Sequence, residues 1–292
     1  MDKLSIIIPL GNAFNGLAMK ERHENLLFAL EHFYSKHEDT ESIVVTQNYI
    51  FPSTPFSSTI HLCSPVFNKG WCINAGVKAS KGETICIAES DMYGFQPYLN
   101  AVMTFMKQKN LQWCFGDTTA IFTTERQRRD IMEYGRCTGT LDKRPPVPDG
   151  YEGGFLMFNR KFFNSLGGCN EWFEELGCID NELVLRAKSA SGTYEAYPES
   201  AWHLWHPECK KHTRSMNLDL QITTKHHSLL FNAFLSLQTS GDLQCPLSKR
   251  FTFSEAWDGF IKNHCRTSKD MIQKSWERYI EENKVSTKEP VQ

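Results

Sequence analysis

The sequence predicts an α/β protein with a mostly parallel sheet flanked by helices. Short apolar runs of strand length alternate along the chain with segments whose apolar residues recur at helical spacing, and this alternation is typical of such sheets. The chain has 292 residues, of which 40% are hydrophobic and 23% charged. This composition is that of an ordinary globular protein, and the length is sufficient for a large core.

The first elements follow one another closely. Residues 4–9 (Leu-Ser-Ile-Ile-Ile-Pro) form an apolar run that predicts a buried strand, ended by proline. Residues from about 17 to 35 have apolar positions at helical spacing, and residues 42–46 and 59–62 predict two further strands.

The middle of the chain continues this rhythm. Residues 71–79 and 98–107 predict helices, residues 84–88 predict a strand, and residues 112–122 have strand character. Ligands of such sheets bind beyond the carboxyl ends of the strands. Because residues 9–12 and the triplet Glu89–Asp91 both fall at the carboxyl ends of predicted strands, we expect them to face one pocket.

The last third of the chain predicts a different organisation. Residues 138–150 contain three prolines and predict an irregular loop, and helical patterns return beyond Thr223. We therefore expect one α/β domain over residues 1–222, a helical C-terminal extension over residues 223–283 and a disordered tail over residues 284–292.

Charge and cysteine usage narrow the class of protein. The net charge is −2, which argues against a nucleic-acid partner, and no apolar run reaches the roughly 20 residues of a membrane span. The first residues are too short and strand-like for a signal peptide. The ten cysteines have no paired spacing, so we expect reduced thiols and a cytoplasmic protein.

Glu89-Ser90-Asp91 places two carboxylates one residue apart where a buried strand ends. Hard divalent cations prefer oxygen ligands and often share them with phosphate oxygens of a substrate. The triplet therefore predicts a site for Mn²⁺ or Mg²⁺. The alternative interpretation is a solvated turn.

His203 and His206 lie in the segment Trp202-His203-Leu204-Trp205-His206-Pro207. Two imidazoles three residues apart can bind one metal, and imidazole suits Mn²⁺ better than Mg²⁺. A histidine pair in a partly buried aromatic turn is the alternative.

Two further segments are rich in polar residues. The segment Phe67–Gly76, which includes Asn68, Lys69 and Asn74, can bind a nucleotide through amides and a helix N-terminus, or Asn68 can simply cap the helix. Asp180 lies at the start of a predicted helix and can be a general base or a carboxylate that stabilises the helix dipole.

The order of these segments resembles the GT-A fold of nucleotide-sugar glycosyltransferases, in particular the β-1,4-galactosyltransferase and chondroitin-polymerase-like families. The family pattern has Phe-Asn-Arg with a later Asn-x-Gly, an acid-x-acid motif, Tyr-Phe-Gly-Gly, a Gly-Trp-Gly-Gly-Glu-Asp motif with a closing arginine, and a Met/His-x-x-His pair. The matching segments here are Phe67–Lys69 with Asn74 and Gly76, Glu89–Asp91, Tyr151–Gly154, Asp180 with Arg186, and His203 with His206.

The resemblance implies specific roles. It implies Asp91, His203 and His206 as ligands of Mn²⁺ and Asp180 as the base. For the nucleotide sugar it implies Pro9, Asn68, Lys69, Asn74, Glu89, Ser90 and Asp91. For the sugar and acceptor side it implies Tyr151, Gly153, Gly154, Glu182 and Trp205.

Three departures separate the chain from the family pattern. Lys69 stands where the family has arginine and lacks its bidentate fork. Glu89 replaces an aspartate. Residues 174–179 replace a tryptophan-containing loop that shapes the sugar pocket, so the sugar itself does not follow from the resemblance.

The resemblance implies a metal-dependent inverting glycosyltransferase that moves a sugar from a nucleotide-diphosphate donor, such as a UDP-sugar, to a hydroxyl acceptor such as a glycan. The alternatives are a nucleotidyltransferase and an inactive carbohydrate-binding GT-A homologue. A nucleotidyltransferase requires a basic, glycine-rich loop after the first strand, whereas residues 10–15 contain one glycine and no base.

Overall fold

The computed structural model describes most of residues 3–207, with gaps at 12–17, 38, 65, 95–96, 117–120, 137–141, 144–153, 176 and 191–192. Beyond residue 207 it describes only Asn232, Leu235, Gln238, residues 241–244, Pro246, Ser248 and residues 255–256. The chain forms two compact units, Met1–Leu247 and Ser248–Gln292. The predicted extension and tail lie almost wholly outside the described residues.

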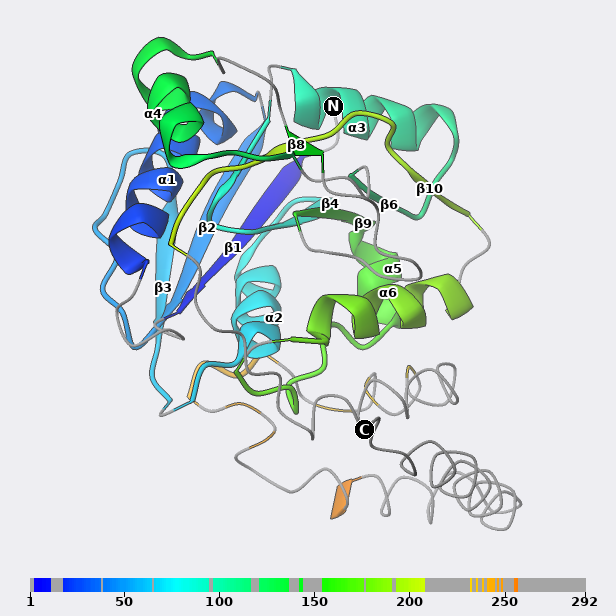
Figure 1. Ribbon diagram of the computed structural model, residues 1–292. Helices are drawn as coiled ribbons and strands as arrows, with labels where there is room; N and C mark the ends of the chain where they lie inside the picture. Colours follow the sequence, from blue (N-terminus) through cyan, green and yellow to red (C-terminus); the bar gives the residue numbers. More distant parts are fainter. Residues whose placement is uncertain are drawn as a thin grey trace, which may run out of the picture. The chain divides into compact units, whose positions relative to one another are not determined.

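The first unit is built on a seven-stranded mixed sheet in the order β10-β6-β9-β4-β1-β2-β3 (Figure 1). Its parallel half comprises β1 (Leu4–Gly11), β2 (Thr40–Gln47), β3 (Ser58–Leu62) and β4 (Thr84–Ala88). β9 (Phe155–Asn159) is antiparallel to both β4 and β6 (Trp113–Phe115), and β10 (Tyr194–Ala196) is parallel to β6. The predicted α/β class with a mostly parallel sheet is confirmed.

Helices cover both faces of the sheet (Figure 1). On one face α1 (Met19–His32) and α3 (Tyr98–Gln108) bury Leu26, Leu30 and Val102 against Ile6 and Ile8 of β1. On the other face α2 (Lys69–Ala79) approaches β1 closely, because a Cβ at Gly76 would lie 2.5 Å from Cγ2 of Ile7. The alternation of residues 6, 7 and 8 between the two faces is the period-2 pattern of a strand.

The remaining elements complete the unit. They are the 3-10 turn η1 (Tyr34–Lys36) and the helices α4 (Glu125–Tyr134), α5 (Arg160–Ser165) and α6 (Ile179–Ala190). A second sheet has the order β5-β11-β7-β8, formed by β5 (Met92–Tyr93), β11 (Trp202–His203), β7 (Ile121–Phe122) and β8 (Asp142–Lys143).

One predicted strand is divided in the structure. Residues 113–115 form β6 in the large sheet, whereas residues 121–122 form β7 in the small one. The strand character predicted for residues 112–122 is therefore present at both ends of the segment, in two strands that belong to different sheets. Local patterns in the sequence also did not predict α4, α5, β9 or β10. Of the predicted irregular loop at 138–150, only β8 lies within the described residues.

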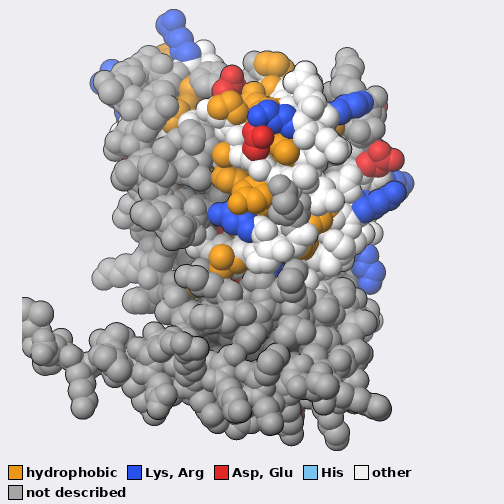
Figure 2. All heavy atoms as spheres, turned by 90° about the vertical axis from the view of Figure 1, so that its right-hand side faces the viewer, with side chains coloured by type: hydrophobic (Ala, Val, Ile, Leu, Met, Phe, Trp, Pro, Cys, Tyr) orange, Lys and Arg blue, Asp and Glu red, His pale blue; other side chains and the backbone are white. Residues whose placement is uncertain are grey.

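The surface agrees with the balanced composition. On the face shown in Figure 2, acidic and basic side chains of the described residues are interspersed with hydrophobic ones. In the described part of the chain, no helix combines the length and the apolar character needed to cross a bilayer.

Candidate metal and donor site

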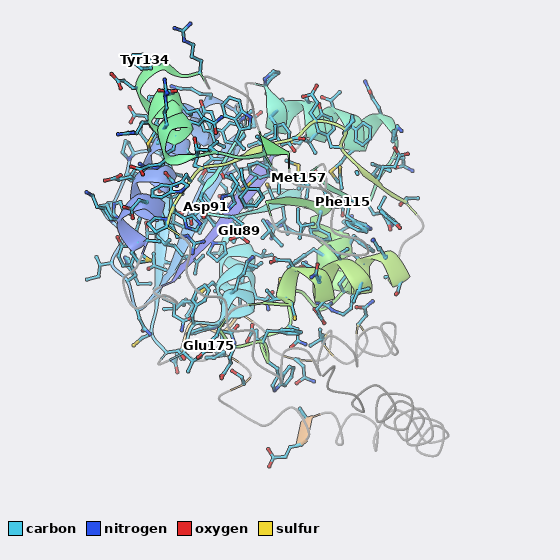
Figure 3. All side chains as sticks on the ribbon, viewed as in Figure 1. Glu89, Asp91, Phe115, Tyr134, Met157 and Glu175 are labelled. Carbon is cyan, nitrogen blue, oxygen red and sulfur yellow. The ribbon has the colours of Figure 1, made fainter. Side chains whose placement is uncertain are left out.

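The acidic triplet forms a turn between β4 and β5, and neighbouring backbone fixes it. The amide N–H of Glu89 donates to the carbonyl of Gly154 (3.3 Å), and that of Leu204 donates to the carbonyl of Asp91 (2.8 Å). Figure 3 shows Glu89 and Asp91 together between α1 and α2. The turn thus joins the large sheet to the small sheet, and it carries Asp91 to the segment that contains the two histidines.

Asp91, His203 and His206 lie close together, as the family resemblance implies. Nε2 of His203 lies 3.4 Å from Oδ1 of Asp91, and Nε2 of His206 lies 3.2 Å from Oδ2. Their potential ligand atoms all lie within 4.8 Å of one another. The Asp91 side chain is 1% exposed, and neither of its oxygens has a hydrogen bond of good geometry within the described part of the chain.

A hydrogen bond to Pro207 sets how the ring of His206 faces Asp91. Nδ1 of His206 lies 2.9 Å from the carbonyl oxygen of Pro207 and therefore donates to it. Nε2 then faces Oδ2 of Asp91 at 3.2 Å, and this contact is satisfied by a proton on Nε2 or by a metal ion between the two atoms. One carboxylate and two imidazoles form a donor set that suits Mn²⁺ or a similar transition metal.

The ionisation of these groups follows from their surroundings. Burial by itself raises the pKa of Asp91, but His203, Arg22 and His206 outweigh burial and hold the pKa below its ordinary value. Burial lowers the pKa of His203, which favours the neutral imidazole that binds metals. Burial also lowers that of His206, but the adjacent Asp91 carboxylate more than offsets it and raises the pKa.

Arg22 of α1 lies beside Asp91 and Glu89, and no sequence pattern pointed to it. Its Nε lies 3.2 Å from Oδ2 of Asp91, and its Nη2 lies 4.0 Å from Oε2 of Glu89. A single arginine on an amphipathic helix has no sequence signal that distinguishes it from a surface residue. Only its position, in the first helix after the first strand, places it near the carboxyl edge of the sheet.

Lys69, Glu89 and Asp180 form a second cluster. Nζ of Lys69 donates to both oxygens of Asp180, at 2.9 and 2.8 Å, and also to Oε1 of Glu89. Burial lowers the pKa of Lys69, but the two carboxylates outweigh it and raise the pKa, so the ammonium stays charged. Burial and the charge of Glu89 raise the pKa of Asp180 despite Lys69. Asp180 therefore lies at the site, but its proton-accepting oxygens are occupied by Lys69.

The side-chain amides of Asn68 and Asn74 form hydrogen bonds within the protein. Oδ1 of Asn68 caps α2 by accepting from the N–H of Trp71 (2.8 Å), and its amide group donates to the carbonyl of Glu171 (2.6 Å). The amide of Asn74 donates to the carbonyl of Cys169 (2.8 Å) and to the Glu171 carboxylate (3.0 Å). Both side chains therefore fix α2 against residues 169–171.

The structure places the other predicted residues in different surroundings. Pro9 is buried in β1 opposite Val45, and Ser90 is buried inside the acidic turn. Glu182 is fully buried, and both its carboxylate oxygens accept from Arg186, at 2.7 and 3.0 Å.

Of the residues predicted for sugar and acceptor binding, Trp205 is half-buried beside His206, and its backbone N–H donates to Oγ1 of Thr123 (2.8 Å). Gly154 has φ of 120°, a conformation that favours glycine, and holds the triplet through its carbonyl. Tyr151 and Gly153 lie outside the described residues.

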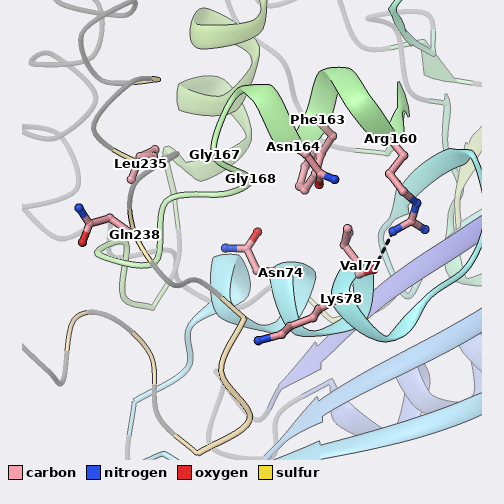
Figure 4. A pocket seen from close by; sticks show the side chains of 10 residues that line it. All are labelled: Asn74, Val77, Lys78, Arg160, Phe163, Asn164, Gly167, Gly168, Leu235 and Gln238. Atoms are coloured by element: carbon pink, nitrogen blue, oxygen red, sulfur yellow. Dashed lines mark hydrogen bonds between the residues drawn. The ribbon is translucent and has the colours of Figure 1, made fainter.

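A cavity of about 380 Å³ lies elsewhere, between α2, α5 and the Gly167–Gly168 turn (Figure 4). Its lining contains no aspartate, glutamate or histidine. Arg160, its largest polar side chain, donates to the carbonyl of Val77 (2.9 Å) and to the hydroxyl of Ser80 (2.7 Å), so it closes the end of α2. This cavity lacks the groups that acid–base or metal chemistry needs.

No protein-family model matches the chain, and no curated protein matches it in sequence. It is similar in structure to residues 1–349 of S. aureus TarS in complex with UDP-GlcNAc, with a TM-score of 0.51, 14% identity and coverage of 89% of this chain and 81% of that one.

Two other solved structures are similar at lower scores. The mannosyltransferase PcManGT from Pyrobaculum calidifontis, in complex with GDP-Man and Mn²⁺, gives a TM-score of 0.47 at 13% identity; the match covers 80% of this chain and 64% of that one. The catalytic domain of Drosophila beta1,4galactosyltransferase 7, in complex with xylobiose, gives 0.45 at 13% identity, with 76% and 80% covered. The similarity to TarS shows that the chain has the GT-A fold.

Proposed function

We propose that this chain is a metal-dependent glycosyltransferase that transfers a sugar from a nucleotide-diphosphate donor to a hydroxyl acceptor. The observation that carries the proposal is the convergence of Asp91, His203 and His206 at the carboxyl edge of a GT-A sheet. The two histidines come from a segment more than a hundred residues after Asp91. A bound divalent cation would offset the negative charge that develops on the leaving nucleotide diphosphate.

Asp180 is the proposed general base. It takes the proton of the acceptor hydroxyl while the acceptor oxygen forms a bond to the anomeric carbon. The bond from that carbon to the diphosphate oxygen breaks, and its electron pair leaves with the nucleotide diphosphate. Attack opposite the leaving group inverts the configuration. The raised pKa of Asp180 supports this role, because a stronger base accepts a proton more readily.

Lys69 must release Asp180 before the base can act. A bound donor offers alternative partners for the ammonium group, namely phosphate oxygens and sugar hydroxyls. In this proposal Lys69 and Glu89 contact the donor directly, and Pro9 and Ser90 border the nucleotide. Asn68 and Asn74 support the donor site indirectly, through the position of α2, because their amides are already hydrogen-bonded.

A UDP-sugar is the first donor to test. TarS, which has the same fold, was solved with UDP-GlcNAc. Imidazole ligands favour Mn²⁺ over Mg²⁺ as the cofactor. A glycan hydroxyl is the proposed acceptor, and Trp205 and Gly154 belong to the acceptor side of the site. No observation in the structure favours a nucleotidyltransferase.

The proposal is tested by a donor screen. Wild-type protein is incubated with a panel of nucleotide sugars and Mn²⁺, and the released nucleotide diphosphate is measured with and without oligosaccharide acceptors. We expect release with at least one donor, and its loss in Asp91→Ala but not in the control Glu31→Ala, whose side chain is exposed. Turnover that persists in Asp91→Ala, or without metal, would contradict the mechanism. A screen in which wild type releases nothing would favour the inactive homologue.

A further inference from the structure

The two histidines of the site lie in a segment that contains little regular secondary structure. β11 contains only Trp202 and His203, and His206 follows in a segment with no regular secondary structure. The ladder of so short a strand supplies few hydrogen bonds. Contacts from outside the segment must therefore set the separation of the two imidazoles.

Asn25 of α1 supplies such a contact. Its side chain is fully buried, and its amide group donates to the carbonyls of Leu204 and Trp205, each at 3.3 Å. These two residues are the ones that separate His203 from His206. One amide thus holds the backbone between the two proposed ligands.

Arg128 of α4 fixes the orientation of that amide. Its Nε donates to Oδ1 of Asn25 (2.6 Å), and its Nη2 donates to Oε2 of Glu24 (2.8 Å). Arg128 is 7% exposed, so this charge-assisted hydrogen bond is protected from water. Because Oδ1 faces the guanidinium, the NH₂ group of Asn25 faces the two carbonyls.

Thr123 secures the other side of the segment. Its N–H donates to the carbonyl of His203 (3.0 Å), and its Oγ1 accepts from the N–H of Trp205 (2.8 Å). The next residue, Thr124, begins α4 with a capping box that involves Gln127. The start of α4 is therefore fixed, and with it the position from which Arg128 reaches Asn25.

We propose that Asn25 and Arg128 are positioning residues that hold His203 and His206 at the separation that a divalent cation requires. This inference rests on the proposed function, because it assumes that the cluster binds a cation. Groups that orient metal ligands from behind typically change metal affinity by about 10- to 100-fold when they are removed.

The test is a Mn²⁺ titration of Asn25→Ala and Arg128→Ala, with free Mn²⁺ measured by electron paramagnetic resonance. We expect Kd for Mn²⁺ to rise about tenfold in each variant. Excess Mn²⁺ should restore nucleotide diphosphate release. The control Arg129→Ala removes an exposed arginine from the same helix and should leave Kd unchanged.

Two further variants keep the test decisive. Arg128→Lys retains the charge but loses the fork, and should give an intermediate Kd even if Arg128→Ala folds poorly. The double variant should be no weaker than Asn25→Ala if Arg128 acts through Asn25. Folded variants with wild-type Kd, or additive losses, would overturn the inference. If wild type itself binds no Mn²⁺, the proposed function fails instead.

Discussion

The candidate site has two halves, the proposed metal ligands and the proposed base, and they differ in the partners that their side chains already have. In the metal half, Asp91, His203 and His206 present oxygen and nitrogen atoms toward one another, and both oxygens of Asp91 lack a well-aligned donor within the described residues. In the base half, both oxygens of Asp180 already accept from Lys69. The proposed metal ligands therefore lie close to one another, whereas the oxygens of the proposed base are hydrogen-bonded to Lys69. In our proposal, donor binding releases Asp180 from Lys69.

Metal removal tests the proposed metal site and has the largest expected effect on turnover. Dialysis against EDTA should abolish donor turnover, and Mn²⁺ should restore it, because a bound cation contributes several kcal/mol to stabilising the leaving diphosphate. That contribution corresponds to about 1,000-fold or more in rate. Nucleotide diphosphate release measures the effect. Undiminished turnover after exhaustive dialysis would mean that Arg22 or Lys69 carries this charge alone.

Asp180→Asn tests the proposed general base. We expect kcat to fall by about 10²- to 10⁴-fold, the usual contribution of a positioned base, while donor affinity changes little. Donor affinity is measured by calorimetry with the nucleotide sugar and the rate by product formation. If transfer survives the substitution, Asp180 only stabilises the start of α6, as a carboxylate at a helix N-terminus does.

Glu182 provides a sharper contrast with Asp180, two residues earlier on the same helix. Like Asp180, Glu182 forms an ion pair with a basic side chain, but in this pair both Glu182 and its partner Arg186 are fully buried. Removing one member of a buried ion pair costs about 3–5 kcal/mol. We therefore expect Glu182→Ala to lower the free energy of unfolding by that amount, measured by urea denaturation. An unchanged stability with a raised acceptor KM would instead support the direct acceptor contact that the family resemblance implies.

Lys69→Met is expected to have the smallest effect. The loss of a charged hydrogen bond to the donor costs about 1.5–3 kcal/mol, so KM for the donor should rise about 10- to 100-fold. Lys69→Arg should lose less. Lys78→Met removes an exposed lysine that lines the cavity of Figure 4 on the same helix, and should leave KM unchanged. An unchanged donor KM in Lys69→Met would show that Lys69 only restrains Asp180.

Much of the fold follows from local patterns in the sequence. The apolar runs at 4–9, 42–46 and 84–88 became β1, β2 and β4, because buried strands need continuous apolar residues. The division of residues 112–122 into β6 and β7 could not be predicted, since both pieces are apolar and only tertiary pairing assigns them to different sheets.

The site was predictable to a different extent in each half. The convergence of Asp91 with His203 and His206 was expected from the family resemblance, whereas the residue types alone left other interpretations open. The hydrogen bonds from Lys69 to Asp180 were not expected, nor were the contacts of Arg22 with Asp91 and of Asn25 with Leu204 and Trp205. Each of these depends on which distant side chain reaches a given carboxylate or carbonyl, and sequence spacing contains no information about such contacts.

A titration of Mn²⁺ into wild-type protein and Asp91→Ala, each with UDP present, would test the metal half without requiring the sugar or the acceptor to be known. Free Mn²⁺ is measured by electron paramagnetic resonance. We predict that wild type removes one equivalent of Mn²⁺ from solution, and that Asp91→Ala leaves the signal of free Mn²⁺ as it is with UDP alone. Equal Mn²⁺ binding by the two proteins would contradict the assignment of Asp91, His203 and His206 as the metal site.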